Sequence, residues 1–229
     1  MNLEAGTVCS LPNYPGGKGP TFLQNLDKWP TIAACGSFLN PDDNSCFQLD
    51  GLPAAAAWTA MPSMLNSHCA SPYQSSSHYL SPYGWFIFGQ DDSCSFQFSN
   101  ISTEILTEDL EWMTTPTVSP YSPSAFPSGA CSVQLNSTHI LVTGGFNGLV
   151  LDSAWLLDLT TYTWMQLAPM LEPRHAHGCL LTSRGEVLVV GGQTGPSGHV
   201  YNVARNEWRE EESLPDEIYY WFPRQGIQI

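Results

Sequence analysis

The most evident shortage in this 229-residue sequence is of charged side chains, and above all of basic ones. Only 12% of the residues are charged, about half the usual share, and 7 Lys and Arg stand against 21 Asp and Glu. The resulting net charge of −14 repels phosphate backbones and anionic membrane surfaces. We therefore expect no nucleic-acid partner, whereas a basic protein would suit this surface.

Long apolar runs are also missing. No stretch approaches the roughly 18 consecutive apolar residues of a membrane-spanning helix, so the sequence predicts no membrane span. The first residues carry neither a basic region nor an apolar core, and we expect no signal peptide among them. Apolar residues still make up 42% of the sequence and aromatic residues 12%, which is enough for the core of one large all-β domain.

Motifs of catalysis and metal binding are scarce. No Gly-x-Ser-x-Gly and no Cys-x-x-Cys occurs, so the sequence predicts neither a serine hydrolase nor a structural zinc site. His175 and His177 would share one face of a strand, where both imidazoles could reach one ion, but no third ligand is identifiable. We therefore expect no enzyme, no metal and no cofactor.

Two N-glycosylation sequons, which begin at Asn100 and Asn136, bear on the compartment. Seven cysteines, few lysines and many Ser, Pro and Gly residues accompany them. Together these features favour a secreted, extracellular glycoprotein with disulfides.

The cysteine spacing suggests disulfides without fixing their connectivity. Cys35 ends one predicted strand and Cys46 begins the next, so we expect this pair to form a disulfide across a loop. Cys69 with Cys94 is a second possible pair.

Two further cysteines, Cys131 and Cys179, lie in apolar strands, where single buried thiols are expected. The odd number of cysteines leaves at least one thiol unpaired or linked to another chain.

A block of about 50 residues recurs along the chain, and repeats of this length indicate solenoids or propellers. Each block has an apolar strand that ends in glycine, then a strand with a tryptophan that runs into proline. Four short strands per block, separated by turns, are typical of a propeller blade. The block tryptophans are Trp58, Trp112, Trp164 and Trp208.

These residues resemble the kelch repeat, most closely in its double glycine, spaced aromatic residue and Trp. The best matches are Gly144-Gly145 with Trp164, and Gly191-Gly192 with Tyr201 and Trp208; Pro169-Met170 and Arg174 complete the first of them. More narrowly, the surroundings of several cysteines resemble those of divergent secreted kelch proteins found in invertebrates. The resemblance implies four-stranded blades in which the glycines and tryptophans mainly serve packing.

We therefore predict an all-β, kelch-type β-propeller that forms a single domain over residues 1–229. It has four recognisable blades and partial blade material at both ends. The blades cover about residues 20–64, 65–117, 118–171 and 172–215, and the partial blades residues 1–19 and 216–229.

Three functions compete at this point. The first is a non-enzymatic binding or assembly module that holds a protein partner, or forms a homo- or hetero-oligomer, through its loop faces. The second is a carrier of an apolar small molecule, a pigment or lipid, at aromatic-lined contacts between subunits. The third is a copper oxidase, because such enzymes are built on kelch-like propellers, although Tyr and His here lack a recognisable ligand spacing. The candidate interaction residues are Tyr219, Tyr220, Trp221 and Phe222.

Overall fold

The computed structural model contains only β-strands as regular elements, which form four sheets in chain order. The predicted all-β architecture is therefore confirmed. No helix in the described part of the chain is long and apolar enough to cross a membrane. The described residues are 12–16, 21–24, 32–36, 43–50, 56–65, 76–80, 82–88, 103–114, 120–121, 127, 129–193, 195, 197–211 and 227–228.

Each sheet is an antiparallel series in which consecutive strands pair, and we number the sheets as blades 1 to 4. Blade 1 consists of β1 (Thr21–Gln24), β2 (Ile32–Cys35), β3 (Cys46–Asp50) and β4 (Ala57–Met61). Blade 2 consists of β5 (Ser76–Leu80), β6 (Gly84–Phe88), β7 (Thr103–Leu106) and β8 (Trp112–Thr114). Blade 3 consists of β9 (Cys131–Gln134), β10 (His139–Thr143), β11 (Ala154–Asp158) and β12 (Thr163–Gln166). Blade 4 consists of β13 (Gly178–Leu181), β14 (Val187–Val190), β15 (Gly198–Asn202) and β16 (Glu207–Glu211).

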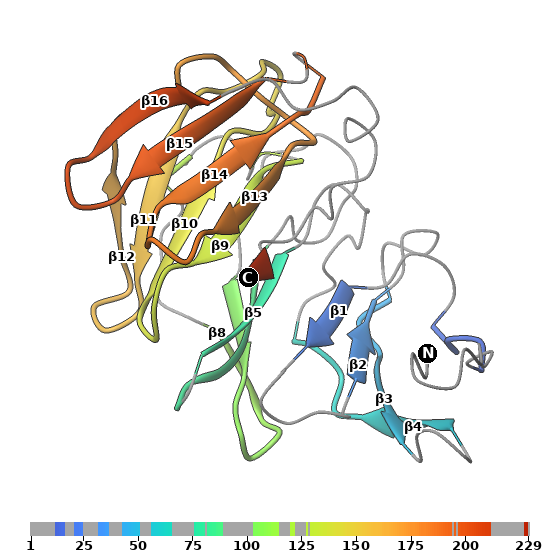
Figure 1. The fold of residues 1–229 in the computed structure, drawn as a ribbon. Helices are drawn as coiled ribbons and strands as arrows, with labels where there is room; N and C mark the ends of the chain where they lie inside the picture. Colours follow the sequence, from blue (N-terminus) through green and yellow to red (C-terminus); the bar gives the residue numbers. More distant parts are fainter. Residues whose placement is uncertain are drawn as a thin grey trace.

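The blades follow one another around a shared inner side. The first strands of successive blades, β1, β5, β9 and β13, are neighbours, and blades 1 and 4 stand at the two ends of the series (Figure 1). Three clusters of buried apolar residues fill the joints between blades 1 and 2, 2 and 3, and 3 and 4. The core is thus divided among the joints instead of lying at one centre.

Strand β10 shows why a strand of an inner blade has a continuous apolar sequence. Side chains alternate between the two faces of a strand, and both faces of an inner blade meet another blade. Ile140 and Val142 therefore pack against blade 2, while Leu141 packs against blade 4. All three residues are fully buried.

The repeat tryptophans join each blade to the one before it. The indole Nε1 of Trp112 donates to the carbonyl of Pro62 at 2.8 Å, and that of Trp208 donates to the carbonyl of Ala168 at 2.8 Å. Trp164 packs, partly buried, against the cluster between blades 2 and 3. Each ring therefore fills a joint, as the sequence predicts.

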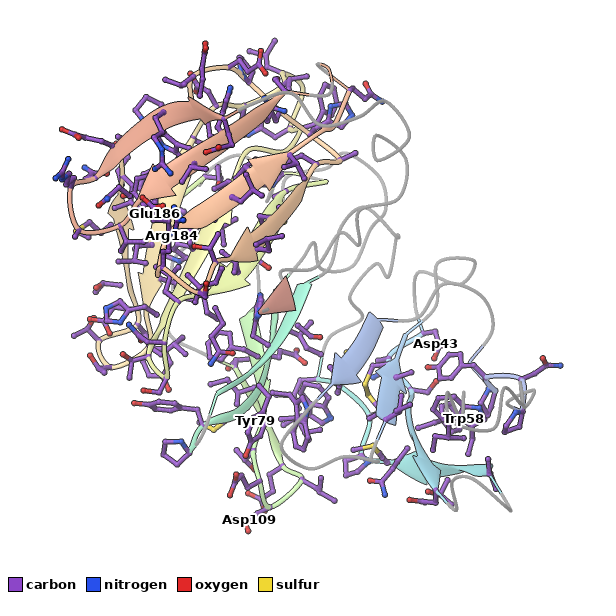
Figure 2. The ribbon with its side chains drawn as sticks, in the orientation of Figure 1. Asp43, Trp58, Tyr79, Asp109, Arg184 and Glu186 are labelled. Atoms are coloured by element: carbon purple, nitrogen blue, oxygen red, sulfur yellow. A yellow bond between two sulfur atoms is a disulfide. The ribbon has the colours of Figure 1, made fainter. Side chains whose placement is uncertain are left out.

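The segment before blade 1 makes a contact of the same kind. Trp58 on β4 (Figure 2) donates its indole N–H to the carbonyl of Pro12 at 3.0 Å. The ring of Tyr14 meets the rings of Phe47 and Trp58 edge-on, at centroid distances of 5.5 and 5.4 Å. Its hydroxyl donates to the carbonyl of Gly36 at 3.2 Å. The described residues 12–16 thus cover the face of blade 1 that carries Trp58.

The last strand, β17 (Ile227–Gln228), pairs in parallel with β13 and gives blade 4 a fifth strand. The partial blade expected at residues 216–229 stays a prediction, because Ile227 and Gln228 are the described residues of that range. The inner edge of β13 offers unpaired backbone groups to any strand within reach. Residues 212–226 lie outside the described part of the chain.

Cys35 and Cys46 form a disulfide between directly opposed positions of β2 and β3. The expected pair is therefore present in the structure. The other proposed pair, Cys69 with Cys94, lies outside the described residues.

A second disulfide joins Cys131 on β9 to Cys179 on β13. The expectation of two single thiols was wrong, because the inner strands of consecutive blades bring these residues to a Cα–Cα distance of 6.0 Å. The bond links blade 3 to blade 4 beside the shared inner side.

Candidate functional site

Three connections at one end of blades 3 and 4 form a surface of loops. They are residues 144–153 after β10, 167–177 between β12 and β13, and 191–197 after β14, of which 194 and 196 are not described. We call these connections the loop surface. Loops held on a rigid scaffold are the usual place for binding residues.

Backbone hydrogen bonds tie the three connections together. Arg174 N donates to the carbonyl of Leu151 at 2.9 Å, and Gly145 N donates to the carbonyl of Arg174 at 2.7 Å. On the other side, Gln193 N donates to the carbonyl of His175 at 3.2 Å. The middle connection is therefore bonded to both of its neighbours, which fixes the loop surface as one unit.

The double glycines allow this close approach. Gly144 and Gly145 have φ values of 59° and 101°, as the sequence predicts for the end of a strand near a crowded axis. A Cβ on Gly144 would lie 2.3 Å from the carbonyl oxygen of Arg174. Gly192, with φ of 97°, is placed similarly, since a Cβ there would lie 2.8 Å from the carbonyl oxygen of His175.

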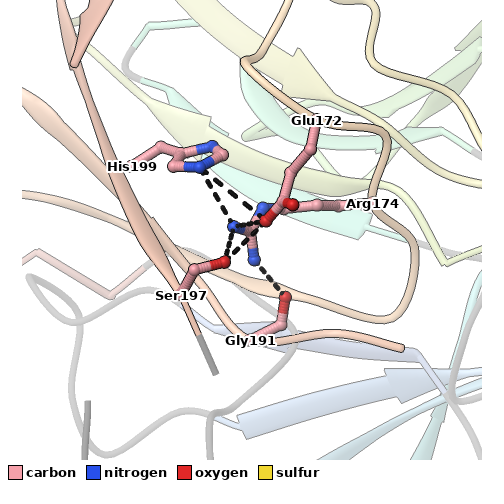
Figure 3. A network of polar contacts seen from close by, with 5 residues as sticks. All are labelled: Glu172, Arg174, Gly191, Ser197 and His199. Atoms are coloured by element: carbon pink, nitrogen blue, oxygen red, sulfur yellow. Dashed lines mark hydrogen bonds and ion pairs between the residues drawn. The ribbon is translucent and has the colours of Figure 1, made fainter. Parts of the chain in front are cut away.

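A buried arginine lies beneath the loop surface (Figure 3). The guanidinium of Arg174 donates to the carbonyl of Gly191 at 2.7 Å and to Ser197 Oγ at 2.5 Å, and it forms an ion pair with Glu172. Its Nη2 also lies 3.3 Å from Nε2 of His199. Because Arg174 bonds to blade 3 through its backbone and to blade 4 through its side chain, it connects the two blades.

The charges of this network favour a structural role. The side chain of Arg174 has no exposed surface, whereas that of Glu172 is 38% exposed. Burial lowers the pKa of Arg174, and the carboxylate of Glu172 opposes this shift. Burial, and then the charge of Arg174, also lower the pKa of His199. Nε2 of His199 faces the guanidinium of Arg174, and Ser197 Oγ is bonded to Arg174 and Glu172, so the three groups do not have the arrangement of a hydrolytic triad.

The candidate histidine pair does not form a metal site. Ala176, between His175 and His177, has a left-handed φ of 54°, so the two imidazoles do not share a strand face, and the premise of that hypothesis was wrong. His177 Nε2 lies 2.9 Å from Thr143 Oγ1, while the ring of His175 lies 5.9 Å from that of Phe146. Among the described residues, no group of three or more His, Cys, Asp and Glu side chains could hold a metal ion.

Two fully enclosed histidines are held neutral. Burial lowers the pKa of His78 to about 4, and its Nε2 lies 2.7 Å from Ser132 Oγ across the joint of blades 2 and 3. Burial, helped by the charges of Arg174 and His175, lowers the pKa of His177 to about 3. Both imidazoles thus resist protonation in the folded protein.

Mild acid is therefore expected to destabilise the fold. In the unfolded chain each imidazole takes up a proton near pH 6.5, so His78 and His177 contribute their full stability above that pH and lose it as pH falls toward about 4. Each should lower the free energy of unfolding by about 1.4 kcal/mol per pH unit below pH 6. Urea unfolding at pH 7.5, 6.0 and 5.0 measures this slope, and His78→Gln with His177→Gln should flatten it. An unchanged slope in the double variant would contradict the assignment.

Other predicted site residues lie elsewhere. Asn136 is exposed in the turn between β9 and β10, at the opposite end of blade 3 from the loop surface. Asn100 and the aromatic run at 219–222 lie outside the described residues, so the carrier hypothesis stays a prediction. The network around Arg174 was not predicted, and its only sequence signal was that Arg174 ends the best-matching repeat.

Residues 128–171, which comprise blade 3 and part of its connection to blade 4, match the Kelch motif family. Blade 3 therefore carries a kelch motif. The four-stranded antiparallel blades agree with that assignment throughout the described residues. The predicted kelch-type architecture is therefore confirmed.

Several proteins resemble part of this chain. "Kelch-like protein 7" of Rattus norvegicus is 37% identical over 73 residues, which are 30% of this chain and 12% of that protein. "Kelch-like protein 30" of Homo sapiens is 36% identical over 88 residues, or 36% of this chain and 14% of that protein. "tRNA wybutosine-synthesizing protein 4" of Eremothecium gossypii is 32% identical over 82 residues, which are 34% of this chain and 12% of that protein. The match thus covers a small part of each relative's length.

Proposed function

We propose that this kelch-repeat protein is a non-enzymatic, extracellular binding module that holds a protein partner on its loop surface. The observation that carries the proposal is a pair of exposed leucines on hydrogen-bonded loops. Leu149 is 74% exposed and Leu171 51% exposed, and both lie in connections that the buried Arg174 network supports. Exposed apolar side chains on the loops of a rigid scaffold are typical of protein contacts.

The loop that carries Leu149 is ordered by its own contacts. Phe146 and Val150 form a bridge across its base, and Asn147 N donates to the carbonyl of Leu149 at 3.3 Å. Gly148, with φ of 109°, makes the tight turn between them. A preorganised loop loses little conformational entropy on binding, which favours affinity.

Acidic groups lie on the same connections as the exposed leucines. Asp152 is exposed beside Leu151, and the partly exposed carboxylate of Glu172 follows Leu171. The chain as a whole carries a net charge of −14. A partner with an apolar patch beside basic groups would complement this surface in polarity and charge.

The extracellular part of the proposal is supported by the two disulfides among the described residues. Disulfides form and persist in oxidising compartments and are rare in the cytosol.

A photo-crosslinking residue at position 149 tests the proposal. The full chain with benzophenone-alanine at 149 is exposed to extracellular proteins of its source, and the same residue at position 110 is the control. Leu110 is 40% exposed in the β7–β8 turn, beside Asp109 at the far end of blade 2 (Figure 2). We expect a discrete protein adduct from position 149 alone.

The identified partner then allows an affinity measurement. Leu149→Asp should raise its Kd by about tenfold or more, as expected for an apolar anchor residue. Leu110→Asp should leave Kd unchanged, and its φ of 61° suits aspartate, so this control should fold. If the partner is a second copy of the chain, sedimentation will show a dimer that Leu149→Asp dissociates. Equal Kd values for both variants would refute the proposal.

A further inference from the structure

We infer that Asn136 accepts an N-linked glycan at the end of blade 3 that lies opposite the loop surface. Asn136, Ser137 and Thr138 form an Asn-x-Thr acceptor sequence with no proline at its middle position. They connect β9 to β10, and both Asn136 and Ser137 are exposed. The acceptor side chain is therefore at the tip of a hairpin.

The turn holds the asparagine in a defined geometry. Oδ1 of Asn136 accepts hydrogen bonds from Thr138 N at 2.8 Å and from Thr138 Oγ1 at 3.1 Å, and His139 Nδ1 lies 3.1 Å from the same oxygen. A backbone hydrogen bond from Leu135 N to the carbonyl of His139 closes the turn at its base. These contacts use Oδ1 and leave Nδ2, the atom that takes the sugar, outside them.

The folded protein has room for a sugar at this turn. Buried packing on the same hairpin begins only at Val133 and Ile140, which lie within the strands on either side. Leu135 at the start of the turn packs against the cluster between blades 3 and 4, whereas Asn136, Ser137 and Thr138 belong to none of the three core clusters. A glycan on Asn136 therefore displaces no core contact.

The direction of the strands places the glycan away from the proposed partner site. β9 begins at Cys131, which pairs with Thr143 beside the loop surface, and it runs away from that surface to Gln134. The turn at 135–138 thus lies at the far end of the blade from Leu149. The glycan would shield one end of the blade and leave the other open.

The modification is a group transfer without redox change. The donor is an oligosaccharide carried on a lipid diphosphate, and the bond between its first carbon and the diphosphate oxygen breaks. A bond forms between that carbon and Nδ2 of Asn136, Nδ2 loses one proton, and the lipid diphosphate leaves. The inference rests on the extracellular part of the proposed function, because this donor acts on chains that enter the secretory pathway.

The test expresses the full chain behind an added, cleavable secretion leader in insect cells. Only leader-cleaved chains, from cells and medium together, are digested and analysed by mass spectrometry, so every chain counted has entered the secretory pathway. Release of the glycan by peptide N-glycosidase in ¹⁸O water marks a modified Asn136 as labelled aspartate. We expect most copies of the peptide that contains Asn136 to carry this label.

Two variants separate the glycan from the turn. Asn136→Asp keeps an oxygen acceptor for Thr138 but removes Nδ2, and it should lose all label at this position. Thr138→Ser keeps the acceptor sequence and should stay modified. An unlabelled Asn136 in leader-cleaved wild-type chains would overturn the inference. If Asn136→Asp abolishes the cross-link from position 149, the glycan does not lie away from the partner site, and that part of the inference is wrong. A cross-link that fails in all variants counts against the proposed function alone.

Discussion

Replacement of Arg174 by methionine should lower the free energy of unfolding by about 3 kcal/mol. The guanidinium has no exposed surface, and its loss leaves the carbonyl of Gly191 without its donor and Glu172 without its counter-charge. Removal of one partner from a buried ion pair costs about 3–5 kcal/mol. We expect the lower end of this range because Glu172 is 38% exposed and can be rehydrated. Urea denaturation at pH 7.5 measures the change.

Arg209 provides a matched control for this prediction. It makes two hydrogen bonds to Glu186, at 2.8 and 3.0 Å, but its side chain is 47% exposed. Exposed ion pairs contribute little to stability, so Arg209→Met should have little effect. If Arg174→Met and Arg209→Met lower the free energy of unfolding equally, the buried Arg174 does not stabilise the contact between blades 3 and 4.

Loss of the disulfide between Cys131 and Cys179 is expected to be about as damaging as loss of Arg174. The two cysteines are 48 residues apart, and the loop-entropy relation assigns such a cross-link about 4 kcal/mol of stability. For Cys35 and Cys46, which are 11 residues apart, the same relation gives about 3 kcal/mol. The double variant Cys131→Ala, Cys179→Ala should therefore be the less stable of the two double alanine variants.

The same comparison tests where each bond acts. The bond between Cys35 and Cys46 joins neighbouring strands of one blade, whereas that between Cys131 and Cys179 joins two blades. Hydrogen exchange of the backbone amides in β9 and β13 should accelerate in the Cys131→Ala, Cys179→Ala variant. It should stay slow in the Cys35→Ala, Cys46→Ala variant. The interpretation fails if Cys35→Ala, Cys46→Ala accelerates exchange in β9 and β13 to the same degree.

Local features of this chain could be predicted from its sequence because they depend on neighbouring residues. The positive φ of Gly144 and Gly145 follows from a glycine pair at a strand end, and the ring of Trp164 in a joint follows from the repeat. Cys35 and Cys46 flank a loop, so any antiparallel pairing of their strands brings them together. In each case one pair of strands decides the outcome.

Features that depend on how the blades pack could not be predicted in this way. Cys131 and Cys179 read as thiols of separate apolar strands, and only the shared inner side of the blades makes them neighbours. The buried charge of Arg174 likewise needs the loop of the next blade around it. The histidine pair failed for a local reason, since nothing in an alanine indicates the left-handed φ that Ala176 adopts.

The bonds from Trp112 and Trp208 to carbonyls of the preceding segments have a consequence for how such chains change in evolution. The donor Trp112 and the acceptor Pro62 come from consecutive units, as do Trp208 and Ala168. Duplication of one whole unit inserts one new donor and one new acceptor, so every joint keeps both of its members. Duplication of half a unit leaves a partly buried indole without its acceptor, which lowers stability. Growth and shortening by complete repeats are therefore the changes that this architecture tolerates best.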